Sequence, residues 1–327
     1  MVLHRPKPVE QHPLQREEIL LGALAPAHVR LRVRACAVCR TDLHIVEGEL
    51  PRRHTTIVPG HQIVGDIVES GDPLNPVGRR VGVSWLGGVD GTCAYCLSAR
   101  ENLCDAPTFT GYDVNGGYAE YVDVRGDFAL PLPSELEDLQ AAPLLCAGII
   151  GFRALRVAGV RPNERVGIFG FGASAHLTLP LLQHWGCEVY VSTRGKSHQA
   201  LARKLGATWV GDTEERPPQA LQRAITFAPS GAVVVSALSS LSKGGVLAIN
   251  AIHLDRMPEF DYDRLLWGER QIRSVTNMTR ADAYDFLKLA ASVKLRPETH
   301  EFPLLRANDA LVALKRDAID GAAVLRP

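Results

Sequence analysis

Residues 165–192 read RVGIFGFGASAHLTLPLLQHWGCEVYVS, and this stretch decides the fold of the second half of the chain. The apolar run 165–169 predicts a buried parallel strand, and the glycine-rich turn after it begins a helix expected over about 173–185. Gly186 ends that helix, and 188–192 predict the next strand. Strand, GxGxxA turn, helix and strand in this order predict a dinucleotide-binding, doubly wound parallel sheet.

The glycine-rich turn supplies the residues that we expect to contact the pyrophosphate of the cofactor. The first glycine allows a tight turn, the second lets the backbone approach the phosphates, and a small third residue allows close packing of the helix. The phosphates would lie at the helix N-terminus, where backbone N–H groups are free to donate. The predicted contacts are Gly170, Gly172, Ala173, Ser174 and Ala175.

The end of the second strand predicts which nicotinamide cofactor is used. Enzymes that use NAD(H) place an acidic residue there for the ribose 2′-hydroxyl, whereas this chain has Thr193, Arg194 and Lys196. Cationic and hydroxyl side chains suit a 2′-phosphate, so NADP(H) is preferred over NAD(H). The alternative interpretation is an ordinary solvated loop.

Later segments continue the alternation of strands and helices. We expect a strand over 224–228, a helix from 232 to about 243 that ends at Gly244-Gly245, and a strand over 246–249. Open α/β sheets bind ligands at the carboxyl ends of their strands. The residues after the last strand are therefore predicted to contact the cofactor: Asn250, Ala251 and Ile252.

Three potential zinc ligands precede the dinucleotide pattern. Cys39 follows the apolar segment 29–33, His61 follows a Pro-Gly turn, and Cys146 lies just before the pattern begins. Two thiolates and one imidazole leave a fourth tetrahedral position open, which is what a catalytic zinc needs. The combination predicts a metal-assisted hydride-transfer enzyme.

A second cysteine cluster lies in GVDGTCAYCLSARENLC, residues 88–104. Cys93 and Cys96 form a CxxC step, Cys104 follows in the next turn, and Asp90 precedes Cys93 by the same step. These four residues predict a closed, structural zinc site with three thiolates and one carboxylate. The alternative is a set of reduced thiols in an ordinary loop.

Cys36 and Cys39 form another CxxC pair, so a ribbon-type zinc site with Cys93 and Cys96 is a further alternative. The two pairs are separated by 53 residues, whereas ribbon sites usually use gaps of ~15–20. We therefore favour packing of Cys36 as a small apolar residue on a buried strand, and the same for Cys187.

Composition restricts the class of protein. The 327 residues are 46% hydrophobic and 22% charged, and the formal net charge is zero. These values are typical of a soluble globular chain with two domains, and they argue against broad binding of nucleic acid or anionic membrane. No apolar run reaches the ~18 residues of a membrane helix, and the N-terminal segment does not resemble a signal peptide. The seven cysteines are therefore expected to stay reduced in the cytoplasm.

Taken together, these motifs resemble the zinc-containing alcohol dehydrogenases of the medium-chain dehydrogenase/reductase superfamily. The resemblance rests on CRTDLH (39–44), PGHQIVG (59–65), CAYCLSARENLC (93–104), GGYAEYV (116–122) and LLCAG (144–148), together with the glycine turn and the terminal strand. It implies an α/β fold in which a mostly β GroES-like catalytic domain is interrupted by a Rossmann domain.

The resemblance also implies domain boundaries. The catalytic domain would comprise residues 1–147 and 276–327, and the cofactor domain residues 148–275. Helices near 281–292 and 306–316 fit the return to the catalytic domain, as does a strand at Ala322–Leu325.

Further site residues follow from the same resemblance. Asp42 resembles the carboxylate that orients the histidine ligand, a role with a clear physical basis. Thr41 resembles the hydroxyl that takes the substrate proton, and His44 resembles the outer end of that relay. Trp85 and Leu86 fall where the family lines its substrate pocket. A helix-start cap is the alternative role for Thr41 and Asp42, and both roles can coexist.

Three positions depart from the family pattern. Gln62 replaces the glutamate that usually follows the ligand histidine, and we expect the lost negative charge to leave the zinc a stronger Lewis acid. Asp90 replaces the usual first cysteine of the structural site. Ala322 follows Gly321 where the family often has an arginine, so one pyrophosphate contact is missing.

The predicted function is hydride transfer between a primary or secondary alcohol, or an aldehyde, and NADP(H). The chain is expected to bind two zinc ions, one catalytic and one structural. The alternatives are a zinc-independent quinone or enoyl reductase on the same fold and a non-catalytic NADPH-binding protein. The resemblance suggests a homodimer or homotetramer, and we expect no nucleic-acid or membrane partner.

Overall fold

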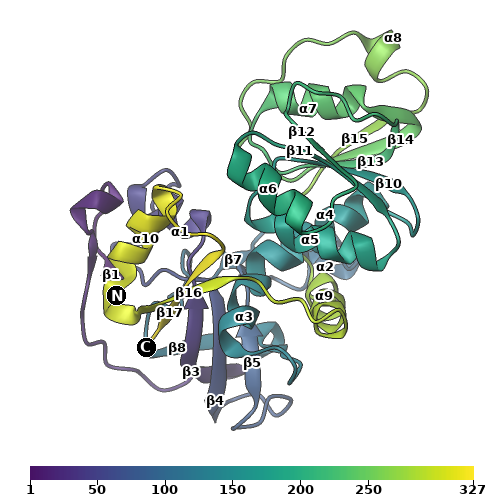
Figure 1. Cartoon of the computed structure of the whole chain (residues 1–327). Helices are drawn as coiled ribbons and strands as arrows, with labels where there is room; N and C mark the ends of the chain where they lie inside the picture. The colour runs from purple at the N-terminus through teal and green to yellow at the C-terminus, as the bar shows by residue number, and fades with distance from the viewer. The chain divides into compact units, whose positions relative to one another are not determined.

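The computed structural model describes residues 1–327, and the chain divides into two units. Unit 1 comprises Met1–Cys146 and Asn277–Pro327, and unit 2 comprises Ala147–Thr276. Unit 2 is therefore an insertion into the sequence of unit 1. Each unit has its own sheet and its own apolar core, and Figure 1 shows the elements of both.

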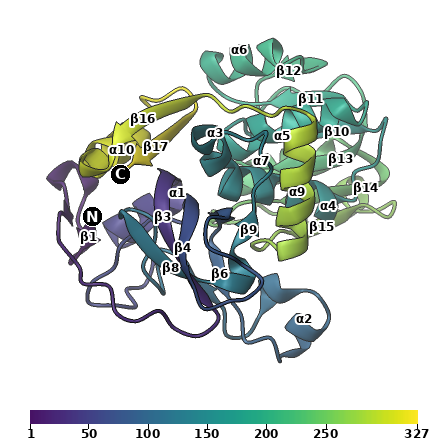
Figure 2. The same cartoon turned by 90° about the horizontal axis from the view of Figure 1, so that it is seen from below.

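Seven strands form the main sheet of unit 1: β3 (His28–Ala37), β4 (Gln62–Ser70), β5 (Arg80–Val83), β8 (Tyr121–Arg125), β9 (Leu130–Pro131), β16 (Thr299–Pro303) and β17 (Ala322–Arg326). Their order is β16-β17-β3-β4-β5-β9, and β8 also pairs with β3. Only β16 and β17 pair in parallel. Figure 2 shows β3, β4 and β8 together.

The long strand β3 explains how this sheet leads to the site. Its first half alternates, so Val29, Leu31 and Val33 are buried while the arginines between them are less so. Its last residues, 35–37, are all buried, because β4 and β17 pair with the strand on both sides there. The strand therefore ends inside the core, two residues before Cys39.

Smaller elements complete unit 1: β1 (Val2–Leu3), β2 (Leu14–Gln15), α1 (Arg40–Glu47), β6 (Leu86–Gly88), α2 (Ala94–Leu97), β7 (Thr108–Phe109), α3 (Asp138–Pro143), α9 (Arg280–Ser292) and α10 (Ala307–Lys315). The pairs β1–β2 and β6–β7 form separate two-stranded sheets. Short 3₁₀ turns lie at Val9–Gln11, Glu101–Leu103, Gly126–Phe128 and Leu304–Arg306.

Unit 2 contains six parallel strands: β10 (Arg165–Phe169), β11 (Glu188–Ser192), β12 (Trp209–Gly211), β13 (Leu221–Thr226), β14 (Leu241–Ile249) and β15 (Gln271–Ser274). Its helices are α4 (Ile149–Ala158), α5 (Ala173–His184), α6 (Lys196–Lys204), α7 (Gly231–Ser239) and α8 (Tyr262–Leu265). The strand order is β12-β11-β10-β13-β14-β15. Figure 1 shows α5 and α6 on one face of this sheet and α7 on the other. The direction of winding reverses between β10 and β13, where doubly wound sheets bind their ligands.

The expected helix after the glycine turn is α5, and it continues through Pro180 without interruption. The expected end of the later helix is wrong. Helix α7 stops at Ser239, because the hydroxyls of Ser239 and Ser240 both donate to the carbonyl of Ser236 and compete with further helical turns. The Gly244-Gly245 pair, predicted to end the helix, lies within β14 instead.

One helical stretch, Asp138–Ala158, is long and apolar enough to cross a membrane by length and composition alone. It runs through α3, a π-helical turn at Leu144–Gly148 and α4. Of its most apolar window, 67% is buried inside the protein, as in the core helix of a soluble protein, so it is weak support for a membrane span.

Candidate active site

Cys39 lies at the N-cap position of α1, where the chain leaves β3. The N–H group of Val38 donates to the carbonyl of Ala323 in β17, which fixes the exit from the sheet. The backbone N–H of Cys39 then donates to Oδ2 of Asp42 at 2.9 Å, so Asp42 also serves the helix start. The first turn of α1 therefore holds Cys39 and Asp42 in one fixed arrangement.

His61 follows the Pro59-Gly60 turn and is completely buried. Gly60 has φ +98°, and a Cβ atom there would lie 2.3 Å from the ring of Tyr118, so only glycine fits. Nδ1 of His61 lies 2.9 Å from Oδ1 of Asp42. Nε2 of His61 is buried and has no hydrogen-bond partner, which is unusual for a buried polar atom and indicates that a ligand belongs there.

Cys146 lies in the π-helical turn Leu144–Gly148. Such turns insert an extra residue into a helix and are frequent at functional sites. Leu145 packs against the backbone of Gly82 in β5, where a Cβ atom would lie 2.5 Å from its side chain. This contact fixes the turn against the sheet of unit 1.

The structure brings Cys39, His61 and Cys146 together. Their potential ligand atoms all lie within 4.8 Å of one another. Two sulfurs and one imidazole nitrogen are the donor set that zinc prefers, with a fourth position left over. The residues present therefore fit a zinc ion.

The protonation pattern of the three residues without a metal also suits a cation. The hydrogen bond from Cys146 lowers the pKa of the Cys39 thiol well below its usual range, against the effect of burial and with a contribution from His61. Burial lowers the pKa of His61, but Asp42 and the Cys39 thiolate outweigh it and raise that pKa to about 10. The hydrogen bond to Cys39 and burial raise the pKa of the Cys146 thiol. A buried thiolate is thus balanced by a buried imidazolium, whose proton a metal ion would replace.

The two residues predicted for the proton relay lie at different depths. Thr41 is buried, and its Oγ1 lies 3.8 Å from Sγ of Cys39. His44 lies one turn further along α1, and its Nδ1 pairs with the carboxylate of Glu49. The side chain of His44 is 24% exposed, so it lies nearer to solvent than Thr41.

A cluster of aromatic rings lies on one side of His61. The ring of Trp85 meets that of His61 edge-on at 5.2 Å between centroids. Trp85 also stacks on Phe109 at 4.9 Å and on Tyr112 at 5.9 Å. Sequence reasoning had not singled out Phe109 or Tyr112, which follow the cysteine loop without a motif of their own.

Leu86, also predicted to line the substrate pocket, lies directly after Trp85 in the chain. It is 1% exposed and packs in a separate apolar cluster with Val89, Cys104 and Phe128. Leu86 therefore packs beneath the second cysteine cluster.

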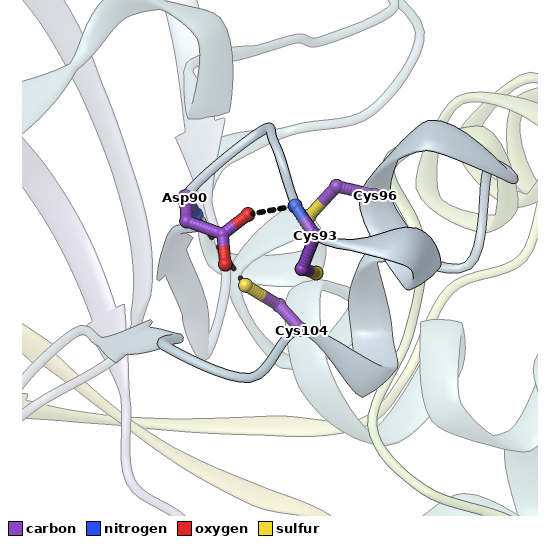
Figure 3. A group of neighbouring side chains, drawn as sticks. All are labelled: Asp90, Cys93, Cys96 and Cys104. Carbon is purple, nitrogen blue, oxygen red and sulfur yellow. Dashed lines mark hydrogen bonds between the residues drawn. The ribbon is translucent and has the colours of Figure 1, made fainter.

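Asp90, Cys93, Cys96 and Cys104 form the second group whose potential ligand atoms lie within 4.8 Å of one another, and Figure 3 shows them around one centre. Oδ1 of Asp90 accepts hydrogen bonds from the N–H groups of Thr92 and Cys93 at 2.7 and 2.9 Å. These N–H groups lower the pKa of Asp90, so its carboxylate is ionised. The N–H of Asp90 points to Sγ of Cys104 at 3.3 Å. The carboxylate of Asp90 also interacts with the thiols of Cys104 and Cys96, so it faces the same centre as the sulfurs.

The ribbon-type alternative does not agree with this arrangement. Cys39 belongs to the group of His61 and Cys146, whereas Cys93 and Cys96 belong to the other group. Cys36 belongs to neither and is buried on β3. Cys187 is also buried, and its Sγ donates to the carbonyl of Arg161.

The glycine turn of unit 2 has the form that a dinucleotide site needs. Gly170 has φ +85°, and a Cβ atom there would lie 2.9 Å from the backbone nitrogen of Ala228. Gly172 caps α5 and has open space around its Cα. Ala173 and Ser174 begin the helix, and Ala175 is buried. The open side of Gly172 leaves room for a pyrophosphate at the helix N-terminus.

The residues after β11 and β14 lie at the same carboxyl edge of the sheet. Thr193 is 3% exposed, while Arg194 is exposed and Lys196 begins α6. The N–H of Asn250 donates to the carbonyl of Thr226, which extends the pairing of β14 with β13. Ala251 follows it, half-buried, and Ile252 is 70% exposed.

Comparison with known proteins assigns the family. A model of the alcohol dehydrogenase GroES-like domain matches residues 25–134, and one of the zinc-binding dehydrogenase domain matches residues 175–292. The probable alcohol dehydrogenase AdhA of Mycobacterium tuberculosis is 44% identical over 330 residues, which cover 99% of this chain and 95% of that protein. The chain belongs to the zinc-type alcohol dehydrogenases of the medium-chain superfamily. The family predicted from the sequence is thus confirmed.

Other relatives of the family agree. An alcohol dehydrogenase of Geobacillus stearothermophilus is 33% identical over 325 residues, with 96% of each chain covered. Among solved structures, the alcohol dehydrogenase of the archaeon Aeropyrum pernix is 26% identical with a TM-score of 0.85, covering 100% of this chain and 99% of that one. A cobalt- and zinc-bound alcohol dehydrogenase of Pyrobaculum aerophilum shares the fold, with 22% sequence identity and a TM-score of 0.87. The match covers 100% of this chain and 98% of that one. The predicted fold, a GroES-like part with a Rossmann sheet, is confirmed.

Proposed function

We propose that the chain is a zinc-dependent alcohol dehydrogenase and aldehyde reductase that transfers hydride between its substrate and NADP(H). The observation that carries the proposal is the convergence of Cys39, His61 and Cys146, with Nε2 of His61 buried and without a partner. A structural role alone does not account for this donor set, because structural zinc sites have four protein ligands.

Cys39, His61 and Cys146 would hold the zinc ion. A zinc ion with an open position supplies a Lewis acid, which lowers the pKa of an alcohol or polarises a carbonyl. Asp42 accepts a hydrogen bond at Nδ1 of His61, so the Nε2 lone pair is directed at the ion. Gln62, which follows the ligand histidine, donates from its side chain to the carbonyl of Ala37 at 3.3 Å and brings no negative charge to the site.

Thr41 and His44 would move the substrate proton. The Thr41 hydroxyl lies beside Sγ of Cys39 and is able both to accept and to donate a proton. His44 would pass the proton to solvent, and its Nδ1 pairs with the carboxylate of Glu49. Trp85, in contact with the ring of His61, would form one wall of the substrate pocket.

The cofactor would bind at the glycine turn of unit 2. The pyrophosphate would lie over Gly170, Gly172 and the start of α5. Arg194 and Lys196 would bind the 2′-phosphate, and no carboxylate stands at the tip of β11 to repel it. The remaining predicted contacts, Ala173, Ser174, Ala175, Thr193, Asn250, Ala251 and Ile252, stay part of this proposal.

A second zinc ion would be structural. Asp90, Cys93, Cys96 and Cys104 leave no open position, and the loop they occupy has few apolar residues of its own. The ion would hold this loop against the cluster of Leu86, Val89 and Phe128. A homodimer or homotetramer, which the family resemblance suggests, and a cytoplasmic location complete the proposal.

The test is activity with a panel of primary and secondary alcohols and aldehydes, with NADP(H) and NAD(H) supplied in parallel. We expect turnover that favours NADP(H) and that Cys39→Ser abolishes while the far-ultraviolet circular dichroism stays unchanged. Cys187→Ser, a buried cysteine of unit 2 that belongs to neither metal group, is the matched control. Undiminished turnover in Cys39→Ser would refute the zinc-dependent mechanism. Binding of NADPH without any turnover would favour the non-catalytic alternative.

A further inference from the structure

Tyr118 is buried beside the proposed catalytic zinc ligands, and it is not part of the proposed proton relay of Thr41 and His44. It lies in unit 1, ahead of β8, and its side chain is 0% exposed. Its hydroxyl donates to Oδ2 of Asp42 at 3.2 Å. The nearby Tyr121, on β8 itself, is 42% exposed.

The hydroxyl completes the set of donors around a buried carboxylate. Asp42 is 0% exposed, and a buried carboxylate needs donors on both oxygens. Oδ1 accepts from Nδ1 of His61, while Oδ2 accepts from the N–H of Cys39 and from Tyr118. Tyr118 and the backbone N–H of Cys39 therefore donate to the same oxygen of Asp42. The other oxygen of this carboxylate contacts His61.

The chemistry of the tyrosine keeps it a donor. Burial raises the pKa of Tyr118, and the charge of Asp42 raises it further. The phenol therefore stays protonated, and its hydroxyl is able to donate to the carboxylate of Asp42.

The position of the ring is fixed relative to His61 by the backbone. Residues 116–118 lie beside residues 58–60, because Gly116, Gly117 and Tyr118 donate to Val58, Gly60 and Pro59 at 2.7, 2.8 and 3.0 Å. Gly60 lacks a Cβ atom, and the Tyr118 ring occupies the space where one would lie. The ring is thus held against the residue that directly precedes the ligand histidine.

We propose that Tyr118 is a positioning residue that acts through Asp42 to hold Cys39 and His61 in the arrangement that binds zinc. The inference rests on the proposed function, since it needs a zinc ion at Cys39, His61 and Cys146. The hydroxyl would fix the carboxylate so that its two oxygens reach the two ligands at the same time.

The test is the zinc affinity of Tyr118→Phe, which removes only the hydroxyl, measured by competition with a chelator of known affinity. Each zinc site should give its own step of zinc release to the chelator. The step that is missing in Cys39→Ser belongs to the site of Cys39, His61 and Cys146. We expect Tyr118→Phe to lower zinc affinity about tenfold at this site and to leave the other step unchanged. Tyr121→Phe, the exposed tyrosine of the same segment, should change neither step.

A double-mutant cycle with Asp42→Asn separates positioning from a general packing role. If Tyr118 acts through Asp42, Tyr118→Phe should lose its effect on zinc affinity in the Asp42→Asn background. Equal effects in both backgrounds, or an unchanged affinity in the single variant, would overturn the inference while the proposed function stands. If Cys39→Ser removes none of the zinc-release steps seen in the wild-type protein, both the inference and the proposed function would be overturned.

Discussion

Nδ1 of His61 lies 2.9 Å from Oδ1 of Asp42, and both side chains are 0% exposed. The same carboxylate accepts the backbone N–H of Cys39 through its other oxygen. One buried acid thus contacts two of the three residues that would hold the catalytic zinc.

Asp42→Asn should lower zinc affinity at the catalytic site by about 10- to 100-fold, because such partners of a metal-bound histidine set its orientation and basicity. The measurement is chelator competition on the purified protein. Asp317→Asn, an acid whose side chain is 79% exposed, is the matched control. An affinity equal to that of the wild type would show that Asp42 does not tune the metal.

Zinc binding at the catalytic site should release protons. In the metal-free protein the raised pKa of His61, about 10, and the raised pKa of Cys146 keep both residues protonated at pH 7.5, whereas Cys39 is already a thiolate. The ion must displace these protons, so the apparent affinity should rise as the pH rises. Calorimetry in two buffers of different ionisation enthalpy measures the release. A binding enthalpy that is the same in both buffers would contradict it.

Asp90→Asn should weaken the second zinc site by roughly tenfold or more. The variant keeps an oxygen that can accept from Thr92 and Cys93 but removes the charge that an ion needs. We expect the melting temperature of the zinc-loaded protein to move toward that of the metal-free form. Asp105→Asn changes an exposed acid in the same loop and should have no such effect. A normal zinc content with an unchanged melting temperature would exclude Asp90 as a ligand.

Arg194→Ser should raise the KM for NADPH about tenfold, because a charge-assisted hydrogen bond contributes roughly 1.5 kcal/mol or more. The KM for NADH should change little, since that cofactor has no 2′-phosphate. Lys204→Ser, at the other end of α6, serves as the control. Parallel changes in both KM values would indicate that Arg194 does not select between the cofactors.

The sequence predicted those parts of the fold and site that depend on local spacing. The strand, glycine turn and helix around Gly170 are encoded within a few residues, and so is the loop of Cys93 and Cys96. The prediction that α7 ends at Gly244-Gly245 was wrong, because the hydroxyls of Ser239 and Ser240 compete for the carbonyl of Ser236 and α7 stops earlier. Local patterns gave no signal for the π-helical turn at Cys146.

Contacts between distant segments were also beyond a single sequence. The hydrogen bond from Tyr118 to Asp42 joins residues 76 positions apart. Trp85 contacts the ring of His61, whereas Leu86, the next residue in the chain, packs in a separate cluster with Val89, Cys104 and Phe128. Both features depend on how distant strands pair and in which register. Local sequence patterns do not specify that pairing.

The zinc content of purified wild-type protein and of Cys39→Ser tests the central claim most directly. Two groups of ligands predict about two zinc ions per wild-type chain and about one per Cys39→Ser chain, with the second ion lost only when Cys93 is also replaced. Equal zinc contents in the wild type and Cys39→Ser would contradict the account, because Cys39, His61 and Cys146 would then not hold a metal ion.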